Sequence, residues 1–117
     1  MEACRFEHRV LHDDVFLINP GRILDNSNAH EMVNALTGAR TDGFRYVVLD
    51  MTALEFLSSA GVGSLLGSVD LFREQGGDII LCHVPEPIMH ILRVLDLAEF
   101  FTIKPDTRQA AIACGRE

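Results

Sequence analysis

Two adjacent serines followed by two spaced glycines form the stretch of this sequence best suited to chemistry. The segment reads Phe56-Leu57-Ser58-Ser59-Ala60-Gly61-Val62-Gly63, and an apolar helical period begins directly after the serines. The first backbone N–H groups of a helix lack partners within the helix, and the helix dipole favours negative charge there. A phosphate on Ser58 or Ser59 would therefore be well accommodated. The same spacing fits a serine that only caps the helix, and both interpretations stay open.

Serines and glycines could also belong to a nucleotide site or to a hydrolase. Gly61, Gly63 and Gly67 give G-x-G-x-x-x-G, which is one residue too long for the dinucleotide fingerprint, and no Gly-Lys-Ser/Thr of a P-loop is present. A serine hydrolase needs a base, and His83 and His90 follow in the sequence. No Gly-x-Ser-x-Gly elbow surrounds either serine, however. Neither a nucleotide-binding site nor a serine hydrolase is favoured. We expect His83 to lie at the surface where a strand ends.

Composition excludes several other classes of protein. The 117 residues carry 10 Lys+Arg against 17 Asp+Glu, a net charge of −7 without a basic cluster, which argues against direct nucleic-acid binding. The three cysteines are widely spaced, and neither they nor the five histidines show metal-ligand spacing, so we expect no disulfide framework, metal site or cofactor. No apolar run approaches the roughly 20 residues of a membrane span, and the N-terminus does not resemble an export signal. We expect a cytoplasmic protein.

Apolar runs predict five strands. Cys4 to Leu11 and Val15 to Ile18, separated by the polar residues 12–14, indicate a β-hairpin. Tyr46 to Met51 and Ile79 to Cys82 are nearly continuous apolar runs, which are typical of strands covered on both faces in a parallel sheet. Phe101 to Ile103 indicates a further short strand.

Four helical periods alternate with these strands. The first runs from Asn26 to about Ala39, with Ser27 or Asn28 as its cap and with Asn28 and Glu31 placed as in a capping box. The second begins near the serine pair and ends at Gly76-Gly77, and the third opens with Pro85-Glu86-Pro87. Thr107 is placed to cap the fourth. The apolar positions predicted to face the core are Ala29, Met32, Val33 and Leu36; Val62, Leu65, Leu66, Val69 and Phe72; Ile88, Ile91, Leu92 and Leu95; and Ala110, Ala111 and Cys114.

The predicted element order defines the fold class. The order β-β-α-β-α-β-α-β-α over residues 1–117 indicates a single α/β domain. Its sheet should be mixed and mostly parallel, with about five strands and about four helices.

The sequence resembles STAS domains of the anti-sigma factor antagonist type over nearly its whole length. The segment from Phe56 to Gly63 looks like the family's Asp-Ser-Ser/Thr-Gly-Leu-Gly motif, with Ser59 at the phosphorylated serine, Ser58 in place of the aspartate and Ala60 in place of the second hydroxyl. Gly21 and Asp25-Asn26 look like the family's Gly-x-Leu-Asp segment with one additional residue.

The resemblance implies a non-enzymatic partner switch. Unphosphorylated antagonist binds an anti-sigma factor serine kinase of the GHKL type and thereby frees a sigma factor, phosphorylation of Ser59 ends the interaction, and a PP2C-type phosphatase resets it. The partner-binding residues implied are Asp25, Asn26, Ser58, Ala60, Gly61 and Val62. The alternative is a STAS module that does not switch and scaffolds a stress-sensing or lipid-transport complex, which the changes at Ser58 and Ala60 keep open.

Overall fold

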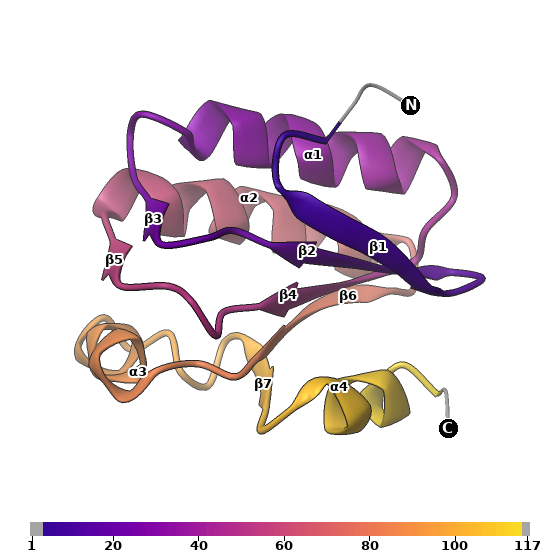
Figure 1. The fold of residues 1–117 in the computed structure, drawn as a ribbon. Coiled ribbons are helices and arrows are strands. Elements are labelled where there is room, and N and C mark those ends of the chain that lie inside the picture. Colours follow the sequence, from indigo (N-terminus) through magenta and orange to yellow (C-terminus); the bar gives the residue numbers. More distant parts are fainter. Residues whose placement is uncertain (1–3, 116–117) are drawn as a thin grey trace.

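A five-stranded sheet lies between helices on its two faces (Figure 1). The computed structural model describes residues 4–115. The strands of the sheet, in spatial order, are β1 (Glu7–His12), β2 (Val15–Asn19), β4 (Tyr46–Asp50), β6 (Asp78–Cys82) and β7 (Thr102–Lys104). Strands β1 and β2 are antiparallel, and the other neighbours are parallel. This confirms the predicted mixed, mostly parallel sheet.

Two very short strands form a second, separate sheet that the sequence did not indicate. Strand β3 (Ile23–Leu24) pairs in parallel with β5 (Phe56–Leu57). A strand of two residues is too short to show the alternation by which strands are recognised in a sequence. This small sheet connects the segment before the first helix with the segment that leads into the second.

The four predicted helices are present as α1 (Ala29–Thr41), α2 (Ser59–Glu74), α3 (Glu86–Val94) and α4 (Thr107–Ala113). Helices α1 and α2 pack side by side over one face of the large sheet, and α4 lies on the opposite face (Figure 1). Within residues 4–115, no helix combines the length and the apolar character that crossing a membrane would require.

The main core lies between the sheet and helices α1, α2 and α3, and it corrects two predicted inner faces. Helix α1 buries Met32, Ala35, Leu36 and Ala39, whereas Val33 is 38% exposed. The buried stripe therefore passes through two alanines, whose small side chains let α1 lie close to its neighbours. In α3 the predicted Ile88 and Leu92 are buried, but Leu95 follows the end of the helix and is 49% exposed.

Two predicted helix caps are wrong. The side chain of Asn28 does not cap α1 and no capping box with Glu31 forms; instead its Oδ1 accepts from the backbone N–H of Asp25 and its Nδ2 donates to the carbonyl of Ile23. Asp106, not Thr107, caps α4, because its carboxylate accepts from the backbone N–H of Gln109 at 2.8 Å. Asp and Thr are both good N-caps, so neighbouring candidates cannot be separated by residue type alone.

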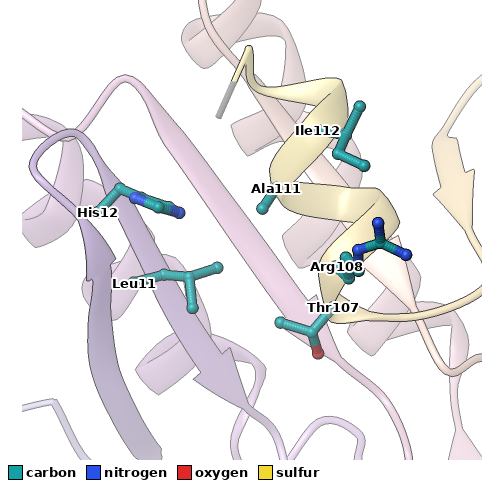
Figure 2. A pocket seen from close by; sticks show the side chains of 6 residues that line it. All are labelled: Leu11, His12, Thr107, Arg108, Ala111 and Ile112. Atoms are coloured by element: carbon teal, nitrogen blue, oxygen red, sulfur yellow. The ribbon is translucent and has the colours of Figure 1, made fainter. Parts of the chain in front are cut away.

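The second face of the sheet carries a smaller core under α4. It includes Val48, Ile80 and Cys82, which alternate along β4 and β6 and are fully buried or nearly so. Burial raises the pKa of the Cys82 thiol to about 11. A groove of about 600 Å³ lies between the end of β1 and α4 (Figure 2), lined by Leu11, His12, Thr107, Arg108, Ala111 and Ile112.

Candidate functional site

The serine pair stands where α2 begins, and its two hydroxyls have different surroundings. Ser58 is the N-cap residue, and its Oγ accepts a hydrogen bond from the backbone N–H of Gly61 at 3.2 Å. Ser59 is the first residue of the helix and is exposed. The interpretation of Ser58 as a cap is therefore confirmed, and the Ser59 hydroxyl is accessible at the positive end of the helix dipole.

The start of α2 is held against the segment after β2 by very close backbone packing. The backbone N–H of Ser58 donates to the carbonyl of Leu24 at 3.0 Å. A β-carbon added to Gly61 would lie 2.4 Å from the same oxygen, so only glycine permits this approach. Gly63 has nothing within 4 Å of an added β-carbon, and the same holds for Gly67. Of these three glycines, only Gly61 is therefore required for close packing.

The turn before α1 is ordered by its own polar side chains. Asp25 accepts from the backbone N–H of Ser27 at 2.8 Å and from its hydroxyl at 2.5 Å. These two hydrogen bonds hold the pKa of the Asp25 carboxyl below its ordinary value, so Asp25 is negatively charged at neutral pH. Because β3 and β5 are parallel, Asp25 after β3 and Ser58 after β5 lie at the same end of the small sheet.

An exposed apolar pair beside this turn was not predicted from the sequence. Ile23 and Phe56 are register partners in the small sheet and are 43% and 53% exposed. Next to them, the guanidinium of Arg22 makes two hydrogen bonds of 3.0 and 3.1 Å to the Glu55 carboxylate. The sequence contains no usable signal for this pair, because Phe56 and Leu57 are adjacent and both apolar, and only the structure shows that Leu57 is buried and Phe56 exposed.

The predicted partner-binding residues gather on this one end of the molecule, but they differ in accessibility. Asn26 is exposed, and Asp25, Ser58 and Ala60 are half-buried. Gly61 and Val62 are buried, and Val62 belongs to the main core. These two residues can shape the site but offer little surface to a partner.

The arrangement does not provide the groups of a serine hydrolase. In the part of the chain that the structure describes, neither serine hydroxyl is hydrogen-bonded to a histidine or a carboxylate. His83 is exposed after the end of β6, as predicted. Serine nucleophiles in enzymes are activated by an adjacent base, and these serines lack one within the described residues. Fold and site together define a small α/β domain that displays a serine at a helix start beside an apolar and acidic surface.

Comparison with known proteins agrees with this class. Residues 9–110 match the STAS domain, so the chain belongs to the STAS domain family. The chain is 30% identical over 93 residues to BtrV of Bordetella bronchiseptica, provisionally named an anti-sigma factor antagonist, with 78% of each chain covered. It is also 35% identical over 60 residues to the anti-sigma F factor antagonist of Paenibacillus polymyxa, covering 51% of this chain and 49% of that protein. Proteins of this kind are regulatory and non-enzymatic.

Solved structures support the fold. The crystal structure of TM1081 from Thermotoga maritima superposes with a TM-score of 0.87 at 20% identity, covering 95% of each chain. Unphosphorylated SpoIIAA superposes with a TM-score of 0.81 at 17% identity, covering 96% of this chain and 98% of that one. At such identities the likeness establishes the fold alone.

Proposed function

We propose that this protein is a cytoplasmic anti-sigma factor antagonist that acts as a phosphorylation-controlled partner switch. The unphosphorylated form binds an anti-sigma factor serine kinase of the GHKL type and thereby frees a sigma factor. Phosphorylation of Ser59 by that kinase ends binding, and a PP2C-type phosphatase restores the unphosphorylated form. The proposal agrees with the names of the curated relatives and with the existence of a solved phosphorylated form of Bacillus SpoIIAA.

The observation that carries the proposal is that the two serine hydroxyls have different surroundings. The Ser58 hydroxyl is engaged as the cap of α2, whereas the Ser59 hydroxyl is exposed one residue later. A kinase active site can therefore reach Ser59 without breaking the cap. In the transfer, the Ser59 oxygen forms a bond to the γ-phosphorus of ATP, the bond to ADP breaks, and the hydroxyl proton passes to a base of the kinase.

The effect of the phosphate follows from where it lies. It adds about −1.5 to −2 charge at neutral pH to a surface that already holds the ionised Asp25. The N-terminus of α2, which has no acidic residue in its first turn, can accept this charge locally. The fold should therefore persist while the partner is repelled by charge and bulk.

The proposed partner-facing surface contains exposed apolar residues as well as polar ones. Asp25 and Asn26 stand beside the start of α2, and the exposed pair Ile23 and Phe56 adds an apolar contact area. Interfaces typically combine a desolvated apolar centre with a polar rim. We therefore include Ile23 and Phe56 with Asp25, Asn26, Ser58 and Ala60 in the proposed contact surface.

The deciding experiment incubates wild type, Ser58→Ala and Ser59→Ala with the cognate kinase and ATP, then locates the phosphate by peptide mass spectrometry. We expect label on Ser59 in the wild type and in Ser58→Ala, and none in Ser59→Ala, which should remain permanently competent to bind. Label on Ser58 would refute the assignment. Label on neither serine would refute the switch and favour the scaffold alternative.

A second experiment tests the surface by calorimetry against the kinase. Asp25→Ala should weaken binding without unfolding the protein, whereas Asp70→Ala, which removes an equal charge from an exposed position further along α2, should bind normally. If Asp25→Ala binds the kinase as tightly as Asp70→Ala and the wild type do, the partner contacts a different face.

A further inference from the structure

Three side chains with metal-ligating atoms converge at the carboxyl end of the large sheet. They are Asp50, Cys82 and His83. Asp50 is the last residue of β4, and Cys82 is the last residue of β6. A carboxylate oxygen, the sulfur and an imidazole nitrogen all lie within 4.8 Å of one another. Asp50 and Cys82 are register partners in the β4–β6 pair, so their side chains leave the same face of the sheet.

The backbone conformation of His83 completes this cluster. Successive side chains of an extended strand point to opposite faces, so His83 would normally point away from Cys82. Its φ of +52° instead lies in the left-handed region, which is uncommon for residues other than glycine. The conformation is anchored where the backbone N–H of His83 donates to the carbonyl of Pro105 at 3.3 Å. As a result, the imidazole nitrogen lies near the thiol and the carboxylate.

Neighbouring residues position the other two groups. Thr52 donates to Asp50 Oδ1 from its backbone N–H at 3.1 Å and from its hydroxyl at 2.5 Å, and these two bonds fix the orientation of the carboxylate. The Thr107 hydroxyl lies 3.8 Å from the Cys82 sulfur. Cys82 is buried, Asp50 is half-buried and His83 is exposed, so the cluster has one buried side and one open to solvent.

We propose that Asp50, Cys82 and His83 form a binding site for a divalent ion of the Zn²⁺ class. One oxygen, one sulfur and one nitrogen donor suit Zn²⁺ or Co²⁺, whereas Mg²⁺ and Ca²⁺ take oxygen ligands. Three protein ligands leave a fourth tetrahedral position for water, on the side where His83 is exposed. Tetrahedral N, O and S ligands of Zn²⁺ stand about 3.3–3.5 Å apart. Because the three atoms lie within 4.8 Å of one another, the side chains need to close by up to about 1.5 Å. On binding, the Cys82 sulfur bonds to the metal and its proton passes to solvent.

Cobalt spectroscopy tests the site directly. Adding Co²⁺ to the reduced protein should give visible tetrahedral bands and a near-ultraviolet thiolate-to-cobalt band, both saturating at one equivalent of Co²⁺. Zn²⁺ should abolish both. Cys82→Ser should lose the thiolate band, while Cys4→Ser, which changes a half-buried thiol outside the cluster, should keep it. Absence of the thiolate band in the wild type, or its persistence in Cys82→Ser, would overturn the proposal.

Two further variants keep the test informative if Cys82→Ser fails to fold. His83→Asn and Asp50→Asn alter an exposed and a half-buried side chain, so both should fold. Each should weaken Zn²⁺ binding in calorimetry by at least about tenfold. His90→Asn, an exposed histidine on α3, is the matched control and should bind as the wild type does. Unchanged affinity in both ligand variants would exclude the site, and none of these measurements involves the kinase or Ser59.

Discussion

Gly61 in the first turn of α2 meets the carbonyl of Leu24 so closely that a β-carbon would stand 2.4 Å from the oxygen. The same oxygen accepts the hydrogen bond from the Ser58 backbone N–H. One carbonyl thus fixes the end of β3 against the start of α2, and with it the position of Asp25 relative to the serine pair.

Because of this contact, we expect alanine at Gly61 and alanine at Gly63 to have opposite effects on the free energy of unfolding. Gly61→Ala should lower the free energy of unfolding by about 1–3 kcal/mol, because the backbone of Leu24 must move to admit the methyl group. Gly63→Ala should raise it by about 0.5–1 kcal/mol, since the position is open and alanine is the better helix former. Urea denaturation of the two variants measures both. Equal effects would mean that the close approach does not constrain the site.

The cap of α2 can be tested apart from phosphorylation. Ser58→Ala should cost about 0.5–2 kcal/mol of unfolding free energy, because the Gly61 N–H loses its partner. Ser58→Asp should keep most of the stability, since aspartate is an equally good N-cap. Ser59→Ala is the control and should change stability little, because its hydroxyl is exposed. A larger loss in Ser59→Ala than in Ser58→Ala would contradict the assigned roles.

A charge mimic at Ser59 should act on binding and not on the fold. Ser59→Asp should reduce affinity for the kinase less than phosphorylation does, because a carboxylate carries less charge and fewer acceptor oxygens than a phosphate. Its melting temperature should equal or slightly exceed that of the wild type, since an anion is favourable in the first turn. Calorimetry and thermal melting check the two parts separately, and a marked fall in melting temperature would contradict the second.

The turn before α1 should weaken in acid. The pKa of Asp25 in the folded protein lies below its unfolded value, so the carboxylate stabilises the turn above the unfolded pKa and this contribution is lost as the pH falls through the folded pKa. Ser27→Ala should raise the Asp25 pKa toward its ordinary value, because both hydrogen bonds involve Ser27 and the hydroxyl one disappears. Carbon-detected NMR titration measures this.

Glu55 provides the internal control for that titration. Its pKa is lowered by the hydrogen bonds and charge of Arg22, which Ser27→Ala does not touch. The pKa of Glu55 should therefore stay low in Ser27→Ala. An Asp25 pKa that does not move while Glu55 behaves as expected would show that the Ser27 hydroxyl is not the cause of the shift.

The sequence by itself determined the large elements of this protein. The apolar runs of β4 and β6 and the helical periods of α1 and α2 are long enough to show their periodicity, so the α/β class and the mostly parallel sheet followed from them. The Ser58-Ser59 segment also indicated where α2 begins, because capping residues and the onset of an apolar period coincide there.

Only the tertiary structure shows the contacts that bring residues from separate segments together. The two-residue strands β3 and β5 bring Asp25 beside Ser58 and expose Ile23 and Phe56, yet no pattern so short is distinguishable from a loop. Likewise, the spacing of the histidines and cysteines indicated no metal site, because Asp50 and Cys82 are 32 positions apart and meet only through the β4–β6 register. Side chains from different strands become neighbours through long-range pairing, and that pairing leaves no local period in the sequence.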